Sequence, residues 1–137
     1  MARITIRRPV ALQVIVTEEF KEQLVAELQE AADDTQRTID QMDFQARRYL
    51  ADLQRTNLQQ AMQMRQQIDA ERNKQEALKK EFLDRITEAK TLELDTEFPR
   101  GTLEGMVEIS EGDHLFDKLG KAQVVIKDGA VIEIREP

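Results

Sequence analysis

Apolar and mostly β-branched residues recur at every second position along residues 3–16, which indicates extended chain. Four apolar residues occupy every second position at the end of this stretch, namely Val10, Leu12, Val14 and Val16. Ile4 and Ile6 follow the same period of two. Because proline donates no hydrogen bond to a sheet, Pro9 either divides the run into two short strands or marks a sheet edge. Thr17 then offers a helix N-cap.

From Thr17 onward the apolar period changes to that of a helix. Between Pro9 and Pro99 there is no glycine and no proline. Mostly apolar residues recur at steps of three and four, first at Phe20, Leu24, Leu28, Ala31, Thr35, Ile39, Met42, Ala46, Tyr49 and Leu53. The same spacing continues, with some positions left out, at Ala61, Met64, Ile68, Leu78, Phe82, Ala89 and Leu92. Such a narrow stripe is typical of a coiled-coil seam. Glu71 and Gln75 interrupt it, so packing should be softest there.

This helical region is either one straight helix or a helical hairpin. A single helix over residues 17–98 would be roughly 120 Å long. The segments that favour strands lie just before and just after it, so one shared sheet requires the chain to return. Thr56 and Asn57 are poor helix formers at the midpoint. We expect an antiparallel hairpin with its tip near residues 54–60, in which paired residue numbers add to about 113, although a straight helix also fits the periodicity.

Residues 99–137 predict short strands separated by glycine-containing turns. The expected elements are a strand at 103–109, a helical turn at 115–119, and a strand hairpin at 123–127 and 130–135. Gly105 indicates a bulge or a close backbone approach, and Gly120 is expected to end the helical turn. Asp128-Gly129 suits a type I′ turn. This segment alone offers little apolar surface, so the N-terminal strand should complete it.

The predicted fold class is therefore α+β, a long antiparallel coiled-coil helical hairpin with a small β module built from both chain ends. The module comprises residues 1–16 and 99–137, and the hairpin comprises residues 17–98. The hairpin region holds 19 acidic and 12 basic residues and so carries the whole net charge of −7, since the two ends have eight of each. This acidic balance opposes broad nucleic-acid binding and attraction to anionic lipid.

Composition excludes several classes of protein. The chain has no cysteine, which rules out a disulfide framework, a zinc ribbon and a cysteine nucleophile. No stretch approaches the roughly twenty apolar residues of a membrane span, and the N-terminus lacks the apolar core of a signal peptide. We therefore expect a cytoplasmic protein.

No catalytic, metal-binding or cofactor-binding residues are predicted. His114 lies among Glu111, Asp113 and Asp117, where a metal site or a proton carrier is conceivable, but a surface loop explains it better. Glu104 and Glu108 with Glu133 could form a carboxylate pair for acid–base chemistry. Solvent-facing strand positions are the simpler explanation. The dispersed glycines form no phosphate-binding loop, so we expect no cofactor and no enzymatic activity.

One basic cluster stands out near the N-terminus. Arg3, Arg7 and Arg8 lie close in sequence, and Lys118, Lys121 and Lys127 join them if the ends share a module. Such a patch could bind RNA or an acidic protein. No aromatic stacking platform accompanies it, because the single tyrosine lies in the helical region. Arginines that prevent strand-to-strand aggregation are the alternative explanation.

Three segments at the chain ends resemble the bacterial YlqD-like family. They are Val14-Ile15-Val16-Thr17-Glu18, then Gly105-Met106-Val107-Glu108-Ile109 with Gly112-Asp113, and lastly Val125-Ile126-Lys127-Asp128-Gly129 with Ile132-Glu133-Ile134-Arg135. The resemblance implies no assigned activity and carries over no site residues. The resemblance does not extend to the glutamine-rich tip, which has Gln54, Gln59, Gln60, Gln63, Gln66 and Gln67.

Two functions agree with these features. The first is a non-enzymatic structural or adaptor protein that presents the coiled coil to a protein partner, with homo-oligomerisation through the helices as a further option. The second is a ribosome- or RNA-associated assembly factor that uses the basic patch on the β module. A membrane partner is not expected, and nucleic acid is the less favoured partner.

Overall fold

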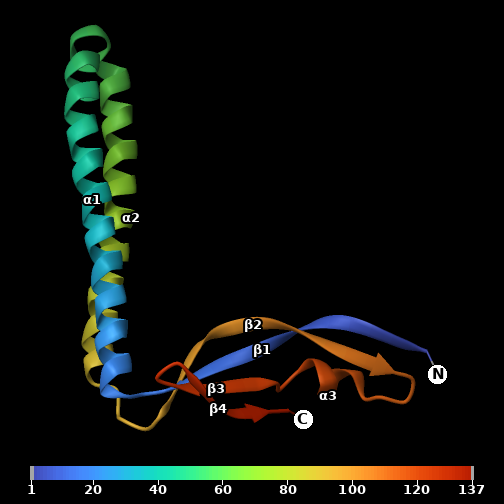
Figure 1. Ribbon diagram of the computed structural model, residues 1–137. Coiled ribbons are helices and arrows are strands. Elements are labelled where there is room, and N and C mark those ends of the chain that lie inside the picture. The colour runs from blue at the N-terminus through green and yellow to red at the C-terminus, as the bar shows by residue number, and fades with distance from the viewer. Residues whose placement is uncertain (1, 137) are drawn as a thin grey trace. The chain divides into compact units, whose positions relative to one another are not determined.

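The computed structural model describes residues 2–136 and confirms the predicted α+β fold (Figure 1). Two long helices form a hairpin, and strands from both chain ends form one mixed four-stranded sheet. The chain divides into two compact units, with boundaries at Lys21/Glu22 and Leu92. The first turn of helix α1 and the segment that follows helix α2 therefore belong with the sheet.

The sheet has the strand order β2-β1-β3-β4. Its strands are β1 (Arg3–Ile15), β2 (Glu97–Ser110), β3 (Gln123–Lys127) and β4 (Ala130–Arg135). β1 pairs antiparallel with β2 along its whole length, but parallel with β3 only over Ala11–Val14. Residues 3–10 thus form a two-stranded ribbon with β2 that runs beyond β3 (Figure 1).

Pro9 does not divide β1 into two strands, because the strand is continuous from Arg3 to Ile15. Ala11, two residues later, donates its N–H to the Ala122 carbonyl at the β3 side (2.9 Å). The Pro9 nitrogen points to that same side, where β3 has not yet begun, so its missing N–H costs no ladder hydrogen bond. The alternative that Pro9 marks an edge is the one observed.

Glycines act at three places in the module as expected. A Cβ at Gly105 would meet Val10 Cγ2 at 3.0 Å, so this glycine allows a close approach, whereas the bulge in β2 lies near Gly101. Asp128 and Gly129 both have positive φ, 49° and 85°, as a type I′ turn requires. Helix α3 (Leu115–Leu119) ends before Gly120 as predicted.

The hairpin consists of α1 (Glu18–Thr56) and α2 (Leu58–Lys90), which lie side by side (Figure 1). Asn57 alone connects them, and its side chain caps α2 by accepting the Gln60 N–H at 3.1 Å. Thr17 Oγ1 caps α1 by accepting the Phe20 N–H at 3.1 Å. Both helices are therefore started by a side chain that satisfies a free backbone donor, and the turn between them is at Asn57.

Polar contacts between the helices fix the antiparallel register. Arg72 Nε lies 3.0 Å from Asp43 Oδ1, and Lys79 Nζ lies 2.7 Å from Gln36 Oε1. The numbers of both pairs add to 115, two more than the expected value.

The hairpin buries its seam unevenly. Its buried residues are Leu24, Ala32, Thr35, Ile39, Ala61, Ile86 and Ala89. Tyr49 and Leu78, which the periodicity places in the seam, are 49% and 39% exposed. Phe20 packs instead in the sheet unit, where its ring lies 5.4 Å from that of Phe98. The apolar period thus overestimates how much of the seam is covered.

Candidate functional site

The histidine considered as a metal ligand lies in a turn whose carboxylate is already engaged. Asp113 Oδ2 accepts hydrogen bonds from Lys118 Nζ (2.8 Å) and from the Ser110 N–H (2.7 Å). These two contacts lower the pKa of Asp113 below its usual value, the Lys118 contact most. His114 itself is exposed and makes no capping bond to α3. Within residues 2–136 no group of three or more histidine and acidic side chains is arranged to hold a metal ion.

The three glutamates considered for acid–base chemistry are kept apart. Glu104 pairs with Arg7 at 3.3 Å and Glu108 with Arg3 at 3.5 Å across β1 and β2. Glu133 lies on β4, at the other end of the strand order, where Arg135 lowers its pKa. Each carboxylate is thus neutralised by an arginine, and no two of them form a catalytic pair.

The N-terminal arginines do not form one basic patch. Alternate residues of a strand point to opposite faces, so Arg8 lies on the face opposite to Arg3 and Arg7. Its side chain is only 11% exposed, pairs with Glu136, and donates from Nη1 to the Lys118 carbonyl at 3.0 Å. Since Arg3 and Arg7 also have carboxylate partners, little unneutralised positive charge remains there.

Unneutralised positive charge gathers instead at the end of the hairpin. We call residues 44–68 the tip segment. It contains one acidic residue, Asp52, and four arginines, Arg47, Arg48, Arg55 and Arg65. All four arginines are exposed, and none has a carboxylate partner within the part of the chain that the structure describes. The tip segment thus has a net charge of +3 in a chain whose net charge is −7.

The tip segment also exposes large apolar side chains. Phe44, Leu58 and Met62 are each more than 60% exposed. Leu58, Met62 and Arg65 follow one another at the spacing of a single helix face, as do Phe44, Arg48 and Arg55 on α1. Two stripes of mixed apolar and positive character therefore run along the tip segment.

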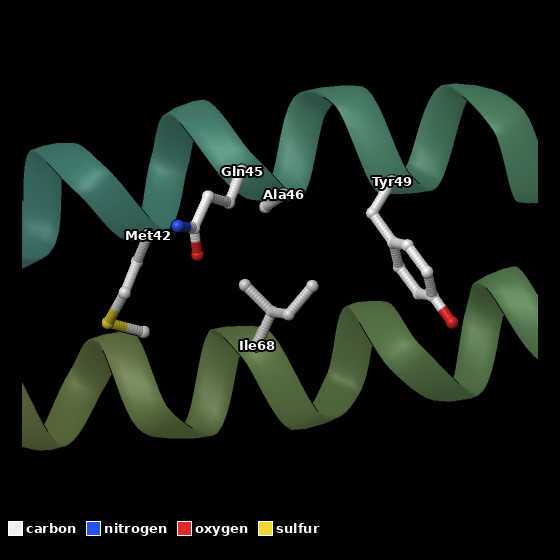
Figure 2. A pocket seen from close by; sticks show the side chains of 5 residues that line it. All are labelled: Met42, Gln45, Ala46, Tyr49 and Ile68. Atoms are coloured by element: carbon white, nitrogen blue, oxygen red, sulfur yellow. The ribbon is translucent and has the colours of Figure 1, made fainter.

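A cavity of about 230 Å³ opens between the two helices beside these stripes. Figure 2 shows Ile68 of α2 pointing toward Ala46 of α1, with Met42 and Tyr49 on either side. The methyl side chain of Ala46 is too short to fill the space opposite Ile68, and Gln45 lines the remaining wall. The cavity is large enough to admit an apolar side chain.

The tip arginines were missed by the sequence reasoning because charge was summed over the whole helical region. A running count would have found them, since the segment contains no lysine and no glutamate, unlike the regions on either side of it. Their lack of carboxylate partners does not follow from the sequence, because Asp43 precedes Arg47 and Asp69 follows Arg65 at the four-residue spacing of helical ion pairs. In the structure Asp43 pairs with Arg72 of the other helix instead.

Comparisons with known proteins agree with the fold. The model of the YlqD protein family matches residues 4–135. The chain belongs to the YlqD family. The uncharacterised protein YlqD of Bacillus subtilis (strain 168) is 32% identical over 127 residues, which cover 93% of this chain and 94% of the relative.

A solved structure supports the same fold. It is the crystal structure of a protein of unknown function from Synechococcus sp. WH 8102, with a TM-score of 0.88 at 24% identity. The match covers 98% of this chain and 96% of that one. Neither the Synechococcus protein nor the Bacillus subtilis relative carries an activity in its name. In the described part of the chain no helix has the length and apolar character needed to cross a membrane.

Proposed function

We propose that this YlqD-family protein is a non-enzymatic adaptor whose tip segment binds an acidic surface of a protein partner. The single observation that carries the proposal is the reversal of charge at the hairpin tip, where four exposed arginines without carboxylate partners stand beside exposed Phe44, Leu58 and Met62. Isolated exposed apolar residues are ordinary, but here they alternate with cations on the same helix faces.

The residue types of the tip segment are those that protein interfaces prefer. Arginine, methionine, tyrosine and phenylalanine are enriched at such interfaces, whereas lysine and glutamate are depleted. The tip segment has four arginines and no lysine or glutamate. Glutamine amides, which are abundant there, add hydrogen-bonding groups that need no counter-charge.

A protein partner explains the apolar residues better than RNA does. Leu58 and Met62 gain free energy only when an apolar counterpart removes them from water, and a phosphate backbone offers none. RNA readers also use aromatic side chains as stacking platforms. The tip segment has only Phe44 and Tyr49, separated by five positions on one helix. An RNA-associated assembly factor remains the competing proposal.

Affinity purification of the tagged full-length protein from its native cells tests the proposal. The variant Arg48→Glu/Arg65→Glu reverses charge on both helices of the tip. The variant Lys80→Glu/Lys90→Glu makes the same change at exposed positions outside it. We expect a protein that survives nuclease treatment to be lost from the first variant and kept by the second. Raised salt should release it, because exposed charges are screened.

Two results would contradict the adaptor proposal. Recovery of the same proteins with both variants would show that the tip charge is not used. Loss of all bound material after nuclease treatment would favour the RNA-associated factor.

A further inference from the structure

The two-stranded ribbon of β1 and β2 has one polar and one apolar face. On the polar face the Arg3–Glu108 and Arg7–Glu104 pairs form a neutral ladder in water. On the other face the strand register places three apolar pairs side by side, Ile4 with Ile109, Ile6 with Val107, and Val10 with Leu103. We call these six residues the apolar ribbon face.

This face has no complete second layer in the described chain. Ile4 is 62% and Leu103 49% exposed, and the other four residues are only half-buried. A two-stranded ribbon is marginally stable alone, and a sheet normally buries its apolar face against another layer. The apolar side chains of the ribbon therefore stay partly exposed, although their alternation with polar residues is typical of a face that packs against a second layer.

The one charged side chain on the apolar ribbon face is neutralised within the chain. Arg8 stands between the pairs, opposite Gly105. Its guanidinium pairs with Glu136 and bonds the Lys118 carbonyl, and the side chain is 11% exposed. Val10 Cγ2 lies over Gly105, which has no side chain to project from the face. What remains is an apolar surface without net charge.

We propose that the apolar ribbon face packs against the same face of a second copy of this chain. In a two-fold dimer each patch meets itself, so a patch with net charge would repel its copy. The apolar ribbon face avoids this because Arg8 is already paired. Outside residues 17–98 the chain has eight acidic and eight basic residues, so charge does not oppose association of the module.

The size of the face predicts a weak dimer. Eight residues of two paired strands cover a patch about 26 Å long and, with side-chain width, about 15 Å across. The area is thus about 400 Å² for each copy and about 800 Å² in total, below the roughly 1,200 Å² at which stable specific interfaces begin, so only a weak and transient dimer is expected. We therefore expect a dissociation constant in the micromolar range, roughly 1–100 μM. This inference does not depend on the tip segment, which stays free for another partner.

Sedimentation velocity of the full-length protein across that concentration range tests the proposal. Leu103→Lys places a charge on the apolar ribbon face at a half-exposed position, so the fold should tolerate it. Met106→Lys is the matched control on the polar face, where Met106 is 61% exposed. Leu58→Lys is the control in the hairpin, at 63% exposure. We expect Leu103→Lys to weaken the dimer at least tenfold and both controls to leave it unchanged.

Oxidative crosslinking gives a second, direct measurement. Because the chain has no cysteine, Val107→Cys, which lies toward the middle of the apolar ribbon face, provides a single thiol near the two-fold axis, whereas Met106→Cys provides one on the far face. Crosslinked dimer from the first variant alone supports the proposal. A wild-type protein that stays monomeric at several hundred micromolar would overturn it, as would a dimer that Leu58→Lys or Met106→Lys disrupts as strongly as Leu103→Lys.

Discussion

The two parts of the helical hairpin share one apolar period but use it differently. The part formed by residues 22–43 and 69–91, the base of the hairpin, contains six of its seven buried residues and every ion pair found between hairpin side chains within the described chain. The tip segment has one buried residue, Ala61, an open cavity and four arginines without carboxylate partners. Side-chain size explains part of the difference, because Ala46 occupies a seam position beside the cavity that a larger residue would fill.

This contrast indicates that the two parts serve different needs. Large buried side chains contribute most of the free energy of folding, and they are concentrated in the base. Residues kept exposed at some cost in stability are typical of binding surfaces. Local opening is also easiest where few apolar contacts are buried. The base should therefore hold the hairpin together while the tip segment adapts to a partner.

The largest expected effect is the loss of a buried side chain from the base. Ile39 is 1% exposed, so Ile39→Ala should lower the free energy of unfolding by about 3 kcal/mol, the cost of lost burial plus a new cavity. Ile68→Ala, beside the existing cavity, should lower it by only about 1 kcal/mol. Urea unfolding followed by helical circular dichroism measures both. Equal losses would show that the two parts are packed alike.

The second prediction concerns the connection at Asn57. Asn57→Ala removes the side-chain acceptor for the Gln60 N–H, which should cost about 1 kcal/mol. Hydrogen exchange should then become faster in the first turns of α2 and stay unchanged around Ile86. Gln59→Ala, two residues later and exposed, is the control and should leave both regions as they are. Uniformly faster exchange would mean that base and tip open as one unit.

Much of this architecture is visible in the sequence because it rests on local rules. Asn57 is a poor helix former and a good N-cap, so it both ends α1 and starts α2. Asp128-Gly129 accepts positive φ values. A pivot at Thr56-Asn57 then predicts the antiparallel register to within two residues.

What the sequence does not reveal depends on contacts between distant residues. The parallel pairing of β1 with β3 joins segments more than a hundred residues apart. Arg8 is adjacent to Arg7 in sequence, yet the alternation of the strand turns it to the other face, toward Glu136. Arg8 has this orientation because β1 continues without a break through Pro9. Proline is tolerated there because the pairing of β1 with β3 begins only at Ala11.

The smallest predicted effect tests the cavity of the tip segment. Ala46→Leu places three more carbon atoms opposite Ile68, in the space of about 230 Å³ that Met42 and Tyr49 also line. Filling this space should raise the free energy of unfolding by about 0.5 kcal/mol, at the low end for such changes because the cavity is open to water. Ala51→Leu adds the same atoms at an exposed position of the same helix and should have no effect.

If a partner inserts an apolar side chain into this cavity, Ala46→Leu should also reduce the recovery of that partner in the affinity purification, while Ala51→Leu should not. A gain in stability with unchanged recovery would confine binding to the exposed stripes around Arg48 and Arg65. A loss of stability would show that the helices already pack closely at Ala46, which would remove the contrast between base and tip at this level of the hairpin.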